Sequence, residues 1–250
     1  MYGDVNIKLF ILPIQFRYKK INDIQIQQKA DLQGQLGLGE SKTYLMPRVC
    51  SFCIVIDKVS CGFNHTAFIT NDKILYMTGF FKKKYIFNQY YYIINKGSNN
   101  FGQLGIGQQN LNNSFQPQLV EDLFKIKKVS CGHSFTLSLT ANGQLYGFGN
   151  NQLGQLGTGD FENKNKQTKV KLEKKIRKIK CGYYHTLILD ENNLLYTCGQ
   201  NDEGQLGLGH KNQNICIPTM LQIKQVWKIA AGQYSGLITE NGELYLFECF

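Results

Sequence analysis

The sequence predicts an all-β protein built from small four-stranded antiparallel sheets that stack on one another. Three observations predict this class: a glycine-rich motif recurs four times, strand-like segments recur in step with it, and tight-turn signals separate the strands. The chain has 250 residues, of which 42% are hydrophobic and 18% are charged, with 25 glycines and 4 prolines. This composition is typical of a globular chain with many turns and excludes an intrinsically disordered one.

The motif G-Q-L-G-x-G is the most regular element of the sequence. Dense glycine can indicate a phosphate-binding loop, but such a loop is one nest of amides beside one helix start, and the chain has no G-K-[ST] to complete it. Four copies between strand patterns instead predict sharp turns, in which leucine fills space against a neighbouring sheet and glutamine hydrogen-bonds loop amides. The copies are Gly34, Gln35, Leu36, Gly37; Gly102, Gln103, Leu104, Gly105; Gly154, Gln155, Leu156, Gly157; and Gly204, Gln205, Leu206, Gly207.

Strand-like segments accompany each copy. An apolar-x-x-apolar-x-small segment leads into a Cys-Gly or Ala-Gly pair, and an alternating segment such as "TLSLT" follows. A hairpin signal such as Asn142-Gly143 then precedes a Leu-Tyr strand. A fourth strand near "QPQLV" or "ICIPTML" completes a sheet that needs neighbours to bury both of its faces. The glycines of the pairs are Gly62, Gly132, Gly182 and Gly232.

This ordered set of motifs resembles the regulator of chromosome condensation repeat family. The family signature combines a Leu-Tyr-x-Trp-Gly strand, an asparagine, G-Q-L-G-x-G and a Cys-Gly-x-x-His-Thr segment, and the resemblance covers about residues 30–247. It implies a β-propeller of that type, seven-bladed in the family, of which this chain supplies an incomplete ring of about four four-stranded blades. The tryptophan position departs from the signature and holds Thr78, Phe148, Cys198 and Phe247.

The histidines of the Cys-Gly-x-x-His-Thr segment are the candidate ligands or bases. His65 and His185 occupy the position, whereas Phe135 and Ser235 replace it in the second and fourth copies. Because the position recurs at a strand end, we interpret the histidines as packing residues. No nucleophile–base pair, carboxylate dyad or metal cluster follows the repeat, so the sequence predicts no enzyme, no catalytic residue, no cofactor and no metal site.

The repeat also divides the chain. Residues 1–29 form an atypical N-terminal segment and residues 30–250 carry the propeller repeats. Residues 80–97 interrupt the repeat, and sixteen of these eighteen residues are Phe, Lys, Tyr, Ile or Asn. We interpret this insertion as a translated intron, with a projecting surface loop as the alternative; sequencing the mature transcript distinguishes the two. The approximate units are 30–79, 98–149, 150–199 and 200–247.

Four copies are fewer than the family fold requires, since seven blades of about 50 residues need roughly 350. We therefore expect part of a ring, with open sheet edges that invite pairing. The chain is then a fragment, an incomplete gene product or one part of a multi-chain ring, and a closed four-blade ring is the remaining alternative.

The charge of the chain is unevenly distributed. Its formal net charge is +10 at pH 7, but most of the excess lies in residues 5–29 and 80–97, so nucleic acid is not an expected partner. No apolar run has the length of a membrane span, and the cysteines follow the repeat rather than a disulfide framework. We expect no membrane association and a cytoplasmic or nuclear location. One basic run remains, interpreted as a solvated edge, with one modest basic face of a strand as the alternative: Lys171, Lys174, Lys175, Arg177, Lys178 and Lys180.

The resemblance implies a protein-interaction scaffold whose partner is another protein. Its specific form would be regulation of a small GTPase by promoting guanine-nucleotide exchange. The alternatives are a substrate-recognition or regulatory module of a larger signalling or ubiquitin-ligase protein, and a non-functional fragment.

Overall fold

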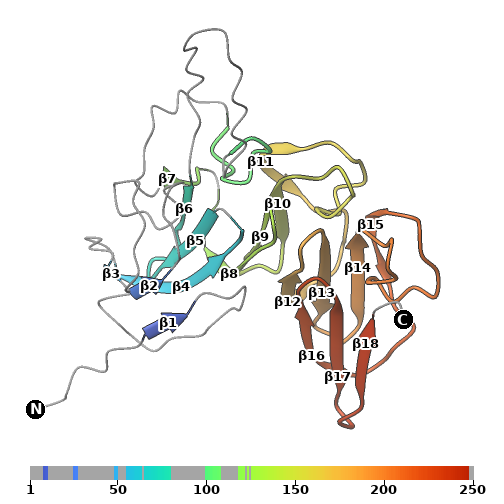
Figure 1. Ribbon diagram of the computed structural model, residues 1–250. Helices are drawn as coiled ribbons and strands as arrows, with labels where there is room; N and C mark the ends of the chain where they lie inside the picture. The colour runs from blue at the N-terminus through green and yellow to red at the C-terminus, as the bar shows by residue number, and fades with distance from the viewer. Residues whose placement is uncertain are drawn as a thin grey trace, which may run out of the picture.

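The structure, a computed structural model, confirms the all-β class. Every regular element among the described residues is a β-strand, and these strands form five sheets (Figure 1). The described residues are 8–10, 25–27, 48–49, 55–63, 65–79, 99–107, 118–121, 123 and 125–247. The first copy of the glycine motif, Gly34 to Gly37, and the insertion at 80–97 lie outside them, as does most of the segment 1–29.

Four of the sheets follow one another along the chain, and we number them 1 to 4. Sheets 1 to 3 are four-stranded and antiparallel, and sheet 4 has three strands among the described residues. Sheet 1 contains β4 (Ile56–Cys61), β5 (His65–Thr70), β6 (Leu75–Gly79) and β7 (Gln118–Leu119); sheet 2 contains β8 (Ile126–Cys131), β9 (Phe135–Thr140), β10 (Leu145–Gly149) and β11 (Lys164–Lys169). Sheet 3 contains β12 (Ile176–Cys181), β13 (His185–Asp190), β14 (Leu195–Gly199) and β15 (Ile215–Met220); sheet 4 contains β16 (Val226–Ala231), β17 (Ser235–Thr239) and β18 (Leu244–Phe247).

A small N-terminal sheet precedes these four. Its strand β1 (Lys8–Phe10) pairs in parallel with β2 (Gln25–Gln27), and β2 pairs antiparallel with β3 (Arg48–Val49). This sheet is the described part of the chain that precedes sheet 1.

The first strand of each of sheets 1 to 4 contains a β-bulge, which explains its unusual apolar spacing. Ile126 pairs with Thr140 and Lys128 pairs with Leu139, so Lys127 is one extra residue on β8. The same register shift occurs in β4, β12 and β16. Because of the extra residue, Ile126 and Val129 are both buried although they stand three positions apart.

The hairpin between the second and third strands uses a left-handed residue at the same position in every sheet. Gly143 has φ of 81°, and its N–H donates to the carbonyl oxygen of Thr140 at 3.1 Å. Gly242 is the equivalent glycine, with φ of 86°, whereas Lys73 and Asn193 hold the position at 65° and 62°. The Asn-Gly signals therefore mark real hairpins, and two further hairpins form without glycine.

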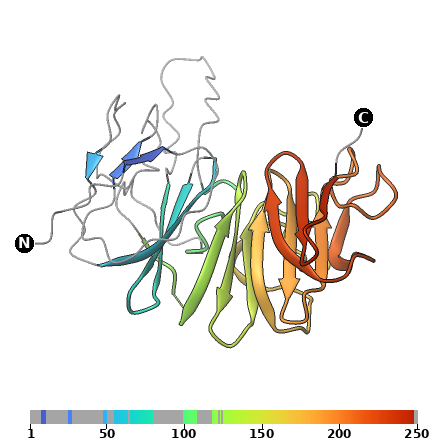
Figure 2. The same cartoon turned by 90° about the horizontal axis from the view of Figure 1, so that it is seen from below.

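Successive sheets pack face to face, and the core lies in the layers between them. Figure 2 shows the four sheets side by side from the teal to the red end of the chain. Between sheets 1 and 2, Ile69 and Met77 share a buried cluster with Val129 and Phe148. Corresponding clusters join sheet 2 to sheet 3 and sheet 3 to sheet 4. Each sheet therefore buries its apolar faces only through its neighbours.

The sheets are offset from the units of the sequence. The strand that follows each glycine motif pairs with the Leu-Tyr strand that precedes the motif: β7 with β6, β11 with β10, and β15 with β14. The first strand of each predicted unit therefore completes the sheet of the unit before it. Backbone hydrogen bonds thus join consecutive units, in addition to the packing between sheets.

The first strands of the sheets lie next to one another on the inside of the arc. β8 contacts β4 and β12, and β12 contacts β16, whereas the fourth strands lie on the outside. We call β4, β8, β12 and β16 the inner strands. The described sheets follow an arc without closing into a ring, in agreement with the predicted incomplete propeller (Figure 1).

Candidate functional site

The three described glycine motifs lie in the loops between the third and fourth strands, and those at Gly102 and Gly154 contact the next sheet. Gly102 has φ of 84°, and a Cβ there would stand 2.4 Å from the Cα of Asn165 in β11. Gly154 has φ of 80°, and its Cβ would stand 2.7 Å from the Cα of Cys216 in β15. Only glycine fits at these two positions, because both the left-handed backbone and the close approach exclude a side chain.

The leucine and glutamine of the motif are buried in this contact. Leu104 joins the cluster between sheets 1 and 2, and Leu156 joins the cluster between sheets 2 and 3. Gln155 accepts a hydrogen bond from the backbone N–H of Leu153 at 3.0 Å and donates to Asn150 at 3.2 Å. The described glutamines and leucines of the motif are all buried: Gln103, Gln155, Gln205, Leu104, Leu156 and Leu206.

An asparagine that entered the sequence analysis only as part of the signature fixes the loop. The Oδ1 of Asn151 accepts the backbone N–H of Leu156 at 2.9 Å, and its amide donates to Thr158 at 3.0 Å and to the carbonyl of Asp160 at 2.8 Å. Asn99 and Asn201 bind the corresponding leucine N–H groups at 2.8 and 3.2 Å. Its recurrence five residues before Leu104, Leu156 and Leu206 is the sequence signal for this role, and Asp31 holds the position before Leu36.

The histidines of the Cys-Gly-x-x-His-Thr segment are buried between sheets. Nε2 of His65 is 3.0 Å from Oγ1 of Thr136, and Nε2 of His185 is 2.7 Å from Oγ of Ser235, each in the next sheet. Burial lowers the pKa of each imidazole to about 4, so both are neutral at physiological pH. The glycine of the pair makes room for the ring, since a Cβ on Gly182 would lie 2.2 Å from His185.

Hydroxyl and thiol groups of the same segments also link the sheets. Oγ1 of Thr186 donates to the carbonyl of Gln155 at 2.7 Å, and the N–H of Cys181 donates to Oγ of Ser130 at 3.0 Å. Burial raises the pKa of the Cys61 thiol to about 11 and that of Cys181 to about 12. These thiols are therefore not activated nucleophiles at neutral pH.

Within the described part of the chain, no group of three or more His, Cys, Asp or Glu side chains is placed to hold a metal ion. The described residues also contain no apolar helix long enough to cross a bilayer. The described repeat motifs lie in contacts between sheets. Two surfaces apart from these motifs lie at one end of the sheets and along the inner strands.

The first surface is a row of rings that we call the aromatic row: Phe63, His133, Tyr183, Tyr184 and Tyr234. These residues occupy the loops between the first and second strands, just after the paired glycine. The rings of Phe63 and His133 stack at 4.4 Å, and His133 lies 5.1 Å from the ring of Tyr184. Phe63, Tyr183 and Tyr234 are 61%, 42% and 44% exposed.

Backbone hydrogen bonds connect the loops of the aromatic row. The N–H of Phe63 donates to the carbonyl of His133 at 3.3 Å, that of His133 to Tyr183 at 3.1 Å, and that of Tyr183 to Gly232 at 2.8 Å. Each loop is thereby held in register with the next. Exposed aromatic residues that are already ordered are typical of binding surfaces, because little side-chain entropy remains to be lost.

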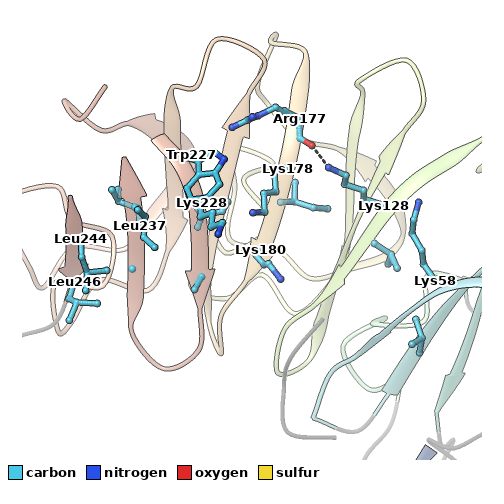
Figure 3. A pocket seen from close by; sticks show the side chains of 17 residues that line it. Lys58, Lys128, Arg177, Lys178, Lys180, Trp227, Lys228, Leu237, Leu244 and Leu246 are labelled. Carbon is cyan, nitrogen blue, oxygen red and sulfur yellow. Dashed lines mark hydrogen bonds between the residues drawn. The ribbon is translucent and has the colours of Figure 1, made fainter. Parts of the chain in front are cut away.

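The second surface is a cleft of 710 Å³ along the inner strands, which we call the inner cleft. Each sheet contributes a lysine to it from the same repeat position, directly after the bulge. Figure 3 shows these side chains following one another from sheet to sheet, with Lys58 at one end of the row. The four are Lys58, Lys128, Lys178 and Lys228.

Cationic side chains of the inner cleft reach from one inner strand to the next. Nζ of Lys58 donates to the carbonyl of Lys127 at 2.6 Å, and Nζ of Lys128 donates to the carbonyl of Arg177. Nη2 of Arg177 in turn donates to the carbonyl of Val226 at 3.2 Å. The cations therefore help to hold successive inner strands together while they keep their charge inside the cleft.

The charged side chains among the described residues that line the cleft are all cationic. Burial and the neighbouring Arg177 and Lys228 cations lower the pKa of Lys178, and burial and Lys178 lower the pKa of Lys180. No acidic side chain is among the described residues that line the cleft. The carboxylate of Asp57 stands beside one end of the row, at 3.5 Å from Lys58 and 2.6 Å from Lys73.

The lysine row was not predicted from the sequence. The basic run 171–180 was interpreted as one solvated edge, but its members separate: Lys174 and Lys175 are exposed before β12, whereas Lys178 and Lys180 line the inner cleft. The interpretation is wrong because it grouped lysines that are neighbours in the sequence, whereas the cleft brings together lysines that occupy the same position in successive repeats. Comparing "IDKVSC", "IKKVSC", "IRKIKC" and "VWKIAA" shows a lysine at the third position of every copy.

The sheets stack along an arc, and the same motifs join each sheet to the next. This arrangement defines a β-propeller repeat protein. Two profiles of the Regulator of chromosome condensation (RCC1) repeat match the chain and together cover more than half of it. The chain therefore belongs to the RCC1 repeat family. The first profile matches residues 96–139, 142–189 and 192–238, and the second matches residues 56–80, 126–155 and 176–205.

Several curated proteins are similar over part of the chain. The X-linked retinitis pigmentosa GTPase regulator of Homo sapiens is 37% identical over 109 residues, which are 43% of this chain and 9% of that protein. The Ultraviolet-B receptor UVR8 of Arabidopsis thaliana is 33% identical over 133 residues, 52% of this chain and 26% of the receptor. The matched region thus spans about a quarter or less of these relatives.

Solved structures share the fold. Human WBSCR16 superimposes with a TM-score of 0.69 at 19% identity, covering 86% of this chain and 54% of that one. Prp20p from Saccharomyces cerevisiae superimposes with a TM-score of 0.67 at 22% identity, covering 84% of this chain and 49% of that one. Most of the chain therefore corresponds to about half of a solved propeller, which confirms an RCC1-type propeller as an incomplete ring.

Proposed function

We propose that this chain is a protein-interaction module that binds a protein partner through its aromatic row. The carrying observation is that Phe63, Tyr183 and Tyr234 are exposed in loops that backbone hydrogen bonds align with one another, and that Phe63 also stacks on His133. Tyrosine is enriched among the residues that dominate binding energies, and isolated exposed rings need no such alignment.

The more specific proposal is that the partner is a small GTPase and that binding promotes nucleotide exchange. Family membership supports it: one relative is named a GTPase regulator, and the structure of Prp20p is described together with its binding to Gsp1p and histones. In this mechanism, loops at one end of the propeller contact the GTPase and weaken its hold on the phosphates and the magnesium ion.

The test uses the full chain and a panel of purified small GTPases loaded with a fluorescent GDP analogue. Binding is measured by biolayer interferometry and nucleotide release by the loss of fluorescence. We expect at least one GTPase to bind and to release nucleotide about ten times faster with the chain present. Truncating Tyr183 and Tyr234 together to alanine should weaken binding by at least about tenfold, since a central aromatic contributes about 1 kcal/mol or more.

The matched control removes exposed apolar side chains elsewhere. Leu119 and Ile217 lie on the outer strands β7 and β15 and are 45% and 49% exposed. Their replacement by alanine should leave GTPase binding unchanged. Equal losses in both variants would exclude the aromatic row. Binding without faster release would support the interaction module and reject exchange, and a panel with no binder would reject the GTPase as partner.

A second function is favoured by one comparison. The Serine/threonine-protein kinase Nek9 of Xenopus laevis is 27% identical over 155 residues, which are 60% of this chain and 14% of the kinase. We propose as the alternative that the propeller is a recognition module of a larger signalling protein. Sequencing of the complete transcript tests it, because a catalytic domain on the same message is required.

A further inference from the structure

We infer that the inner cleft is a second binding site, whose ligand is an acidic polypeptide segment with apolar side chains between its carboxylates. The site is distinct from the aromatic row: it lies along the inner strands, not in the loops at their ends. The inference rests on the proposed function only in that the ligand is a polypeptide. A chain that binds no GTPase can still bind an acidic segment here.

The repeat places a cation and an apolar residue side by side in every sheet. The lysine after each bulge is followed directly by a buried valine or isoleucine, and both line the cleft. The buried apolar residues beside the cations are Val59, Val129, Ile179 and Ile229. The cations thus recur from sheet 1 to sheet 4, and the apolar side chains that the cleft exposes lie in sheet 4, where Trp227, Leu244 and Leu246 are 50%, 63% and 66% exposed.

The side-chain charges that line the cleft are of one sign. Arg177 and Lys180 add to the four lysines, so six of the described residues that line the cleft are basic and none is acidic. The hydrogen bonds from Lys58 and Lys128 go to backbone carbonyls, which satisfy donors without removing charge. Only at the Lys58 end does a carboxylate, that of Asp57 at 3.5 Å, offset part of the charge of one of the four lysines among the described ion pairs. Low-dielectric walls around charges of one sign concentrate their field, so the cleft attracts anions.

The form of the cleft favours carboxylates over phosphates. Phosphate sites commonly use helix N-termini, whereas the described residues that line this cleft all lie in β-strands. Single-stranded nucleic acid binds through several stacking aromatics, but Trp227 is the only aromatic residue among the described ones that line the cleft. Lysines distributed over four sheets match an extended ligand with several separated charges (Figure 3).

The experiment measures binding of fluorescein-labelled twelve-residue peptides to the full chain by fluorescence anisotropy. One peptide alternates glutamate with leucine or valine, and its partner carries glutamine in place of every glutamate. We expect the acidic peptide to bind at least tenfold more tightly than the glutamine peptide. Its affinity should fall at least tenfold between about 50 and about 500 mM salt, because the attraction is screened.

Three lysines are then changed together: Lys128→Gln, Lys178→Gln and Lys228→Gln. Glutamine removes the charge but retains an N–H donor for the neighbouring carbonyl. The matched control removes the same charge from exposed lysines outside the cleft lining, by Lys174→Gln, Lys175→Gln and Lys224→Gln. We expect the cleft variant to lose at least tenfold in peptide affinity and the control to lose less than threefold.

Several outcomes would overturn the inference. These are equal binding of the two peptides, equal losses in the two variants, and binding of inositol hexakisphosphate or poly(U) without binding of the acidic peptide. Should the cleft variant fail to fold, the peptide pair and the salt dependence on the wild-type chain remain decisive. None of these measurements involves a GTPase, so failure here is separate from failure of the proposed function.

Discussion

The loop after β10 and the loop after β14 carry nearly the same sequence in different surroundings. Both contain G-Q-L-G and both are held by an asparagine, Asn151 or Asn201, that accepts the leucine N–H. In the first loop, Gly154 lies against the backbone of β15 in the next sheet. In the second loop, a Cβ on Gly204 would meet no described atom within 4 Å, because sheet 4 shows no fourth strand among the described residues.

This difference separates two roles of the motif. The internal hydrogen bonds and the positive φ are present in both loops, so the loop takes its shape without an opposing strand. The close approach exists only where the next sheet supplies its outer strand. The motif therefore specifies a loop that takes its shape on its own. Where the next sheet lies close to the loop, that contact is a second reason why only glycine fits.

The largest effect that tests this separation is expected at Gly154. Its replacement by alanine adds a Cβ that would meet the Cα of Cys216 and the carbonyl of Ile215, both at 2.7 Å, on a backbone with positive φ. We expect a loss of about 3 kcal/mol or more in the free energy of unfolding, measured by urea denaturation of the full chain.

Gly204→Ala is the matched control, since it has a similar φ and no close contact with a described residue. Only the cost of the left-handed conformation applies, which is about 1 kcal/mol. Equal losses of stability at the two positions would show that the backbone conformation alone requires glycine. The close contact with the next sheet would then not be a separate reason for it.

A second pair compares the glycines that precede the histidine position. A Cβ on Gly182 would stand 2.2 Å from the ring of His185, so Gly182→Ala should cost about 2 kcal/mol. Gly232 has no described atom within 4 Å of such a Cβ, and Ser235 replaces the ring there, so Gly232→Ala should change stability by less than about 0.5 kcal/mol. Urea midpoints of the two variants measure the difference, and a costly Gly232→Ala would contradict it.

The asparagine pair should show a smaller difference. Asn151→Ala removes the acceptor of the Leu156 N–H in a loop buried against sheet 3, and we expect a loss of about 2 kcal/mol. Asn201 is equally buried, but Gly207 and Gly209 of its loop are exposed, so water reaches the freed N–H more easily once the side chain is removed, and Asn201→Ala should cost about 1 kcal/mol. Thermal unfolding of both variants tests the order, which reversed values would refute.

The stacked sheets could be predicted because their signals are local. A turn glycine such as Gly143 and a Leu-Tyr strand determine their own backbone, and their recurrence counts the sheets. The register between strands was less accessible. The bulge at Lys127 inserts one residue into β8, and only the paired strand shows where it falls. The pairing of β11 with the preceding sheet likewise depends on a partner distant from the motif.

The inner cleft depends on contacts that no single repeat contains. Lys128 looks like any solvated lysine until β12 is placed beside β8, where its ammonium group meets the carbonyl of Arg177. The aromatic row has the same origin, because Phe63 and His133 stack only after two sheets have packed. A repeated sequence pattern predicts the strands and turns of one sheet, whereas these two candidate binding surfaces form only where neighbouring sheets meet.

The histidine position provides a further comparison within the chain, with an expected effect of about 1 kcal/mol per residue. Burial holds the pKa of His65 and His185 near 4 in the folded chain, against about 6.5 when unfolded. Between these values the unfolded chain binds protons that the folded chain does not, so stability is complete above about pH 6.5 and falls as the pH falls. At about pH 5.5 we expect a loss of about 1 kcal/mol per histidine relative to about pH 7.5.

The chain itself supplies the control for this pH dependence. Phe135 occupies the same position in sheet 2, above Gly132, and does not titrate. The double variant with His65→Phe and His185→Phe should therefore lose most of the difference between the urea midpoints at the two pH values. A difference as large as that of the unchanged chain would mean that the buried imidazoles are not its source. The half-buried His133, whose pKa burial also lowers, accounts for part of what persists.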